Sequence, residues 1–281
     1  MLKYFVTRRR TQEYPCITRT TTQSQNILAA ELFRFSSRLT IHRRSLNLIS
    51  LLRRKLSCGK EIMKKITVIT GHYGSGKTNL AVNLAVKAAE EGKKVTVADL
   101  DIVNPYFRTA DFKELFDEKG ITLAAPDFAN SNLDIPSIQF DVEELAAVSD
   151  CLIIDVGGDD AGAFALGRYA EALLSYGSET ELYYVINQRR YLTQTPDEVL
   201  GLMYEIEAAA RMKHTAIVNN TNLGSETTLE IVEASEEFAA ETAERAGLPL
   251  AFTTCPEELA EFSENENIFP IKVYVKPLWE K

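Results

Sequence analysis

Eight consecutive residues have the types and spacing that bind phosphate. They match the Gly-x-x-x-x-Gly-Lys-Thr phosphate-loop pattern. In sequence order they are Gly71, His72, Tyr73, Gly74, Ser75, Gly76, Lys77 and Thr78. In such a loop the backbone N–H groups turn inward and form an anion site, which the N-terminus of the following helix reinforces. We expect Lys77 to reach the β- and γ-phosphates and the Thr78 hydroxyl to bind Mg²⁺.

The residues on either side of this loop support the assignment. An apolar, β-branched run at 66–70 predicts a strand before the loop, and a helical pattern begins near Lys77 and ends at Gly92. A chance glycine-rich turn is the alternative, and the strand-loop-helix context disfavours it. The sequence therefore predicts a nucleoside triphosphate site.

A second run predicts the carboxylate that usually accompanies a phosphate loop. Residues 151–155 read Cys-Leu-Ile-Ile-Asp, an apolar strand that ends in Asp155. A buried strand of this kind, a Walker B strand, delivers one carboxylate to the Mg²⁺ shell. Gly158 follows and is expected to present its N–H to the γ-phosphate. The alternative is an ordinary buried strand with a solvated aspartate at its end.

Two further acids, Asp99 and Asp101, lie at the end of a strand predicted over 94–100. Because side chains alternate along a strand, we expect them to face opposite sides, one toward the phosphate loop and the other supporting the loop structure. A capped strand end with two solvated acids is the alternative.

Strand and helix patterns alternate along the rest of the chain. Further strands are predicted at 121–125, 182–187, 215–219, 249–253 and 268–276, and helices at 111–119, 142–148, 195–212, 225–246 and just after Cys255. This order predicts an α/β fold, a three-layer, doubly wound, mostly parallel sheet. Ligands bind outside the carboxyl ends of such strands. The phosphate loop, Asp101, Asp155–Gly158 and Asn219 all fall at such ends, and we expect them to form one site.

Composition limits the class of protein. The 281 residues are 45% hydrophobic and 25% charged, which is ordinary for a globular chain. No apolar run approaches the length that spans a bilayer. The four cysteines form no Cys-x-x-Cys pair and the three histidines are scattered, so a disulfide framework and a zinc site are disfavoured. These features predict a cytoplasmic protein.

Charge divides the chain near residue 62. Residues 1–62 carry 13 lysines and arginines against three acids, a net charge of +10, whereas the whole chain carries −9 and residues 63–281 therefore −19. We expect residues 1–62 to be a disordered basic extension, and residues 63–281 to be the nucleotide-binding domain. A mis-assigned start before Met63, an organelle leader and a functional tail remain alternatives for the extension.

With these motifs in view, residues 64–258 resemble the MinD/ParA branch of P-loop ATPases, which includes the nitrogenase iron protein and cobyrinate amide synthase nucleotide domains. The resemblance implies that Asp101 positions the attacking water and helps to hold Mg²⁺. It also implies that Asn219 reads the adenine edge while Pro256 and Glu257 wall the base. Since Asn220 and Asn222 occupy the lysine and aspartate places of a guanine reader, ATP is favoured over GTP.

The sequence also departs from that family. His72 stands in place of the signature lysine, and Arg108 or Arg168 could supply the missing cation, although either fits a surface arginine. The second switch has no cysteine and Glu258 interrupts a Cys-Pro-x-Cys pattern, which argues against an iron–sulfur cluster. The charge of −19 on residues 63–281 argues against DNA binding. We also find no basic amphipathic helix at the C-terminus of the kind that targets a protein to a membrane.

Three functions follow from this comparison. The first is an ATPase switch for an unknown protein partner, with a nucleotide-dependent homodimer as one form of it. The second is an ATP-dependent small-molecule ligase or kinase. The third is a nucleotide-binding module without hydrolysis. The sequence favours the first.

Overall fold

The computed structural model describes residues 63–101, 109–124 and 140–275. The basic extension at 1–62 and Arg108 lie outside the described residues, and so their predicted roles stay predictions. Residues from Met63 onward belong to one compact unit, and no helix among the described residues is long and apolar enough to cross a membrane.

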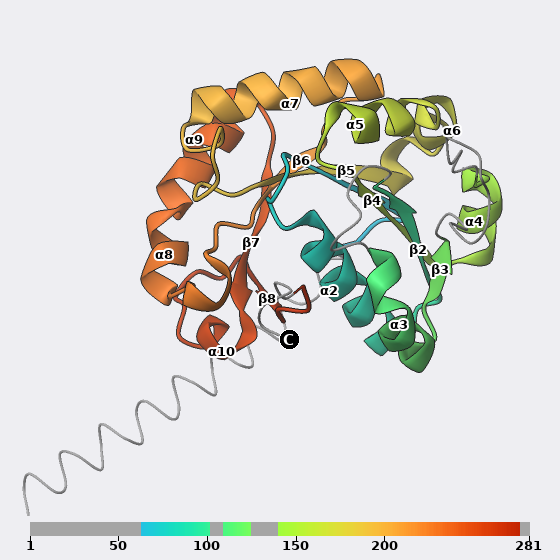
Figure 1. Ribbon diagram of the computed structural model, residues 1–281, viewed down its shortest axis with the longest axis horizontal. Helices are drawn as coiled ribbons and strands as arrows, with labels where there is room; N and C mark the ends of the chain where they lie inside the picture. The colour runs from blue at the N-terminus through green and yellow to red at the C-terminus, as the bar shows by residue number, and fades with distance from the viewer. Residues whose placement is uncertain (1–62, 102–108, 125–139, 276–281) are drawn as a thin grey trace, which may run out of the picture. The chain divides into compact units, whose positions relative to one another are not determined.

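A single eight-stranded sheet forms the centre of the domain (Figure 1), with strand order β3-β2-β4-β1-β5-β6-β7-β8. Every neighbouring pair is parallel. The strands are β1 Ile66–Thr70, β2 Val95–Leu100, β3 Thr122–Ala124, β4 Cys151–Val156, β5 Thr180–Ile186, β6 Ala216–Asn219, β7 Leu250–Pro256 and β8 Ile268–Ile271. This topology places β1 between β4 and β5, and β4 between β1 and β2, at the middle of the sheet.

Helices follow most of the strands, as parallel pairing requires. The α-helices are α2 Lys77–Glu90, α3 Lys113–Lys119, α4 Val142–Val148, α5 Asp160–Gly167, α6 Ala170–Ser175, α7 Pro196–Ala210, α8 Leu229–Ala234, α9 Glu236–Ala246 and α10 Glu257–Ala260. Short 3₁₀ turns occur at Thr109–Phe112, Gly177–Glu179 and Gly224–Glu226.

The central strands are apolar along their whole length because helices cover both of their faces. On one face Ile69 and Ile153 pack with α2 and with Phe116 of α3, and on the other Val68 and Ile154 pack with α4, α5 and α6. Figure 1 shows α2 and α3 on one side of the sheet and α4 to α7 on the other. The predicted three-layer, doubly wound fold is confirmed, and the sheet is wholly rather than mostly parallel.

Most predicted elements lie where the sequence places them, and one helix is wrong. The start of α7 has the expected capping box, in which Thr195 and Glu198 each bond the other's backbone. The single helix predicted over 225–246 is instead a 3₁₀ turn followed by α8 and α9. The break falls at Ser235, whose hydroxyl donates to the Val232 carbonyl and so competes with the helical ladder. Helices α5 and α6 were not predicted.

Candidate functional site

The phosphate loop lies between β1 and α2 and closes on itself. The Lys77 ammonium donates to the His72 carbonyl at 3.2 Å, and the Lys77 side chain is buried. Gly71, Gly74 and Gly76 all have positive φ, in the region that favours glycine. A Cβ on Gly71 would lie 2.4 Å from the Val185 carbonyl oxygen, and so β5 holds the loop closely. This is the backbone shape that an anion site requires.

Asp155 lies at the carboxyl end of β4 and faces the first turn of α2. The Thr78 hydroxyl donates to Asp155 Oδ2 at 2.8 Å, so the two predicted metal ligands are in contact. In the strand register Asp155 is directly opposite Asp99 of β2. Burial, together with the Asp99 carboxylate, raises the pKa of Asp155 to about 8, although Lys77 and Thr78 act in the opposite direction.

Asp101 lies just beyond β2, and Asp99 holds its backbone. The Asp101 N–H donates to Asp99 Oδ1 at 2.9 Å. Asp101 Oδ1 lies 3.1 Å from the position that a Cβ on Gly157 would occupy, next to the end of β4. Burial lowers the pKa of Lys77, and the carboxylates of Asp155, Asp101 and Asp159 partly offset this effect. The structure therefore brings Lys77, Asp101 and Asp155 into one electrostatic cluster.

The segment after β4 rests on the phosphate loop at Gly158. A Cβ on Gly158 would lie 2.6 Å from Lys77 Nζ and 2.7 Å from the Tyr73 N atom. Only glycine fits there without displacing the phosphate-loop backbone. Asp159 then caps α5, because its Oδ1 accepts from the Gly162 N–H at 2.9 Å. Gly158 is therefore placed next to the loop, and its predicted bond to the γ-phosphate stays a prediction.

Two polar atoms in this cluster point to a bound group. Within the part of the chain that the structure describes, Asp155 Oδ1 and Ser75 Oγ are buried and have no hydrogen-bond partner. Buried polar atoms without partners are rare and need an explanation. A hydroxyl and carboxylates near a phosphate loop are the oxygen ligands that Mg²⁺ prefers. The residues present therefore fit Mg²⁺ bound together with a nucleotide. Thr78 and Asp155 would supply oxygen ligands, and Asp101 lies nearby.

Comparison with known proteins agrees with this geometry. The family model of the CobQ/CobB/MinD/ParA nucleotide-binding domain matches residues 66–224, more than half of the chain. The chain belongs to this family. The match begins with β1 and includes the phosphate loop, Asp101, Asp155 and Asn219. The expected kinship with MinD and ParA is confirmed, whereas the effect of His72 in the signature-lysine place is a separate question.

Individual relatives match this domain more weakly. The tyrosine-protein kinase YwqD of Bacillus subtilis is 42% identical over 52 residues, which are 18% of this chain and 22% of the kinase. The FtsY structure from Mycoplasma mycoides is 21% identical, with a TM-score of 0.48, over 68% of this chain and 59% of that one. The BceF tyrosine kinase domain is 23% identical, with a TM-score of 0.39, over 63% and 75%. The chain thus spans about a fifth of the curated kinase and 59% of the FtsY chain.

Three asparagines, Asn219, Asn220 and Asn222, lie at the carboxyl end of β6 and just after it. The Asn219 side chain is fully buried, with Nδ2 donating to Ser235 Oγ at 2.9 Å and Oδ1 accepting from the Thr221 hydroxyl at 2.8 Å. Asn220 instead contacts the phosphate loop, since its Nδ2 donates to the Ser75 carbonyl at 2.6 Å. Adenine recognition by Asn219 stays a prediction, and the contact of Asn220 with the phosphate loop is one that no local sequence pattern predicts.

The other predicted base contacts lie at the end of β7. Pro256 is buried as the last residue of that strand. Glu257 is exposed at the start of α10 and pairs with Lys272 at 3.5 Å. Two residues before Pro256, the Thr254 hydroxyl donates to Asn220 Oδ1 at 2.5 Å. This bond links the end of β7 to the phosphate loop through Asn220, although the predicted walling of the base is untested.

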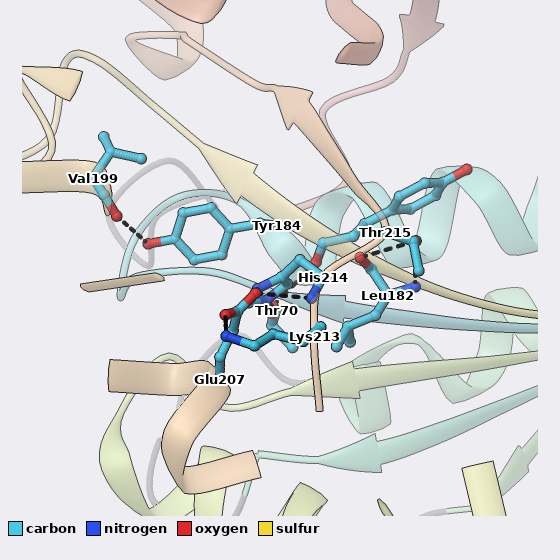
Figure 2. A network of polar contacts seen from close by, with 9 residues as sticks. Thr70, Leu182, Tyr184, Val199, Glu207, Lys213, His214 and Thr215 are labelled. Atoms are coloured by element: carbon cyan, nitrogen blue, oxygen red, sulfur yellow. Dashed lines mark hydrogen bonds and ion pairs between the residues drawn. The ribbon is translucent and has the colours of Figure 1, made fainter. Parts of the chain in front are cut away.

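A buried polar network supports the strand that enters the phosphate loop (Figure 2). The hydroxyl of Thr70, the last residue of β1, lies 2.7 Å from His214 Nε2. His214 Nδ1 lies 3.1 Å from Glu207 Oε1, and Lys213 donates to Glu207 Oε2 at 2.5 Å. Burial raises the pKa of Glu207, but hydrogen bonds from His214 and Lys213 outweigh it and bring the pKa to about 2. Burial lowers the pKa of His214.

Proposed function

We propose that this chain is a Mg²⁺-dependent ATPase that acts as a nucleotide-dependent switch for a partner protein. The observation that carries the proposal is the cluster at the carboxyl ends of β1, β2 and β4. There Lys77, Thr78, Asp101 and Asp155 meet, while Asp155 Oδ1 has no hydrogen-bond partner among the described residues. Family membership supports nucleotide binding at this cluster.

Each residue has a role in the proposed reaction. The phosphate loop and Lys77 bind the phosphates, and Thr78 and Asp155 hold Mg²⁺, which neutralises charge on the phosphate oxygens when it is bound. Asp101 orients the attacking water, because its carboxylate lies next to the end of β4 and its backbone N–H is held by Asp99. Gly158 lies between this water site and α5. A change in the bound nucleotide would therefore be transmitted to the surface through the segment after β4.

The segment after β6 supports ATP rather than GTP. A guanine edge presents two N–H groups, which suit a carboxylate acceptor better than an amide. Residues 219–222 read Asn-Asn-Thr-Asn and contain no carboxylate. The Asn222 side chain also donates to the Asn220 carbonyl at 2.7 Å and accepts from the Gly224 N–H at 3.1 Å. We therefore propose ATP as the nucleotide, and from cysteine usage a cytoplasmic location.

Exposed aromatic side chains near the site support a protein partner, including a second copy of the chain. Tyr73 in the phosphate loop is 60% exposed, Phe164 in α5 is 65% exposed and Tyr191 after β5 is 80% exposed. All three follow the carboxyl ends of central strands. Exposed apolar groups that form one patch are typical of contact surfaces. A protein partner, and the absence of DNA and of an iron–sulfur cluster, stay predictions.

Phosphoryl transfer to an acceptor other than water is the second candidate. The family description covers CobQ and CobB as well as MinD and ParA, and the curated relative matched over 52 residues is a tyrosine-protein kinase. Both observations support this second candidate. An ATP-dependent ligase or kinase would turn over only when its acceptor is added. A switch would hydrolyse ATP slowly by itself and faster with its partner.

Asp101→Ala provides the test. We expect the variant to bind Mg·ATP within about threefold of wild type and to lose at least about a hundredfold in hydrolysis, because it removes a group that acts on the attacking water. Asp117→Ala, an exposed acid in α3, is the matched control. Phosphate release and pull-down in ATP and in ADP are measured together. Normal turnover by Asp101→Ala, or identical pull-downs in both nucleotides, would contradict the proposal.

A further inference from the structure

We propose that Arg190 binds the nucleotide phosphates, as a second cation beside Lys77 that the segment after β5 places over the phosphate loop. The inference rests on the proposed nucleotide site. The arginines predicted from the sequence as substitutes for the missing lysine are Arg108 and Arg168, and Arg190 is not one of them.

Arg190 lies against the middle of the phosphate loop. Its Cδ and Nε atoms are each 3.7 Å from the position that a Cβ on Gly74 would occupy. A Cβ at Gly74 would therefore be in ordinary van der Waals contact with Arg190, so the Arg190 side chain passes beside the loop at Gly74. Gly74 has a φ of +75°, part of the backbone shape that turns N–H groups toward an anion. A cation at this position adds to the field of those N–H groups.

The backbone around Arg190 is a built turn. The Asn187 carbonyl accepts from the Arg190 N–H at 3.1 Å and from the Thr193 hydroxyl at 2.7 Å, and both Asn187 and Thr193 are buried. The Gln188 N–H donates to the Thr221 hydroxyl at 3.1 Å, which fastens the turn to the segment after β6. The position of Arg190 is therefore fixed from both sides.

One residue in this turn has an unfavourable backbone conformation. Leu192 has a φ of +64°, which costs energy for a residue with a Cβ. Such strain persists where the surrounding structure enforces it, and it occurs most often at binding sites. Here the strain accompanies the turn that holds Arg190 against Gly74.

The guanidinium group is available for an anion. Among the described residues no carboxylate forms an ion pair with Arg190, and the side chain is exposed. Arg245 shows the contrast, since it pairs with Asp197 and Glu241. Residues 63–281 carry a net charge of −19. An unpaired arginine on such an acidic domain, in contact with the phosphate loop, is well placed for phosphate.

The other groups at the loop leave room for this cation. Lys77 is buried and donates to the His72 carbonyl, and Asp155, Asp101 and Asp159 lie near it. Burial and the nearby Lys77 lower the pKa of His72, which disfavours the charged form of its imidazole. A guanidinium group can donate two parallel bonds to phosphate oxygens. Arg190 thus supplies the positive charge that His72 does not.

The test compares two neighbouring arginines. Arg190→Ala removes the proposed contact, Arg190→Lys keeps the charge but not the paired donors, and Arg189→Ala removes an equal charge from the same exposed turn. We expect Arg190→Ala to weaken Mg·ATP binding about tenfold or more, Arg190→Lys to weaken it less, and Arg189→Ala to stay within about twofold. Titration calorimetry with Mg·ATP measures each value, and thermal unfolding without nucleotide should be equal for all variants.

Each other outcome overturns a stated claim. If wild type binds Mg·ATP and Arg190→Ala binds it equally well, this inference is wrong while the proposed function stands. An equal loss in Arg189→Ala would show a general charge effect, and a lower unfolding temperature of Arg190→Ala without nucleotide would show a structural clamp on Gly74. Either would overturn the phosphate contact. If wild type binds no nucleotide, the proposed function falls and this inference with it.

Discussion

Two polar clusters meet at the end of β1, and they differ in how their atoms are satisfied. On one side, the buried Thr70 hydroxyl, His214 and Glu207 form a chain of hydrogen bonds, and Glu207 also bonds the exposed Lys213 (Figure 2). On the other side, Asp155 Oδ1 and Ser75 Oγ have no partner within the described residues. Since burying an unpaired polar atom costs free energy, the two clusters have different purposes.

The difference separates architecture from function. The His214 network uses both ring nitrogens and both Glu207 oxygens, and so it can position Thr70 directly before Gly71 without a ligand. In the second cluster the pKa of Asp155 is raised, and Asp155 Oδ1 and Ser75 Oγ lack hydrogen-bond partners among the described residues. A divalent cation and phosphates would supply partners for these oxygens. We therefore expect mutations in the first cluster to change stability and mutations in the second to change binding.

The largest effect is expected for Lys77→Ala. The variant removes the buried ammonium of the phosphate loop and should weaken Mg·ATP binding by at least about a hundredfold, because a buried charge contact with phosphate is lost. The unfolding temperature without nucleotide should fall little or rise, since burial already disfavours the charged form of Lys77. Calorimetry and thermal unfolding measure the two. Lys113→Ala, an exposed lysine in α3, is the control. Unchanged affinity in Lys77→Ala would remove this loop from the site.

For Glu207→Gln we expect a smaller effect, and one on stability rather than on binding. The amide cannot pair with Lys213 as a charge and offers His214 a weaker acceptor, so the free energy of unfolding should fall by about 1–3 kcal/mol at pH 7. Mg·ATP affinity should stay within about twofold. Urea unfolding and calorimetry measure these values, with Glu205→Gln, an exposed acid in α7, as the control. A large loss of affinity at full stability would erase the distinction between the two clusters.

The Glu207→Gln variant should also change how the free energy of unfolding depends on pH. Glu207 has a pKa of about 2 in the folded chain against an ordinary 4.5, so its stabilisation is complete above 4.5 and is lost as pH falls toward 2. Burial lowers the pKa of His214 from 6.5, so protonation favours unfolding as pH falls below that value. Wild type should therefore lose stability in acid, and Glu207→Gln should lose less between pH 4.5 and 2.

The sequence predicts the parts of this molecule that depend on local pattern. The phosphate loop, β4 with Asp155 and the capping box at Thr195 follow from short motifs and apolar runs, and the structure has them at the predicted places. The alternation of strands and helices also predicts the sheet, since parallel strands need crossover helices. These features are encoded within a few neighbouring residues.

Contacts between distant segments were not predictable in the same way. Asn220 reaches Ser75, and Arg190 reaches Gly74, across more than a hundred residues of sequence, because β5 lies beside β1 in the sheet and β6 lies beside β5. Ser235, where the predicted helix breaks, also accepts a bond from Asn219 of β6, which no helical pattern reveals. Asp99 was seen as one of two alternating acids, but its position opposite Asp155 depends on strand register.

The Mg²⁺ dependence of ATP binding tests the central claim most directly, in wild type and in Asp155→Asn. Calorimetry is done with Mg²⁺ and with EDTA. Because Thr78 and Asp155 meet beside the phosphate loop, we expect wild type to bind ATP about tenfold or more tightly with Mg²⁺ than with EDTA. Asp155→Asn should bind about equally in both. Equal ATP affinity of wild type with Mg²⁺ and with EDTA would contradict the account. So would an Asp155→Asn variant that keeps the full effect of Mg²⁺ on ATP affinity.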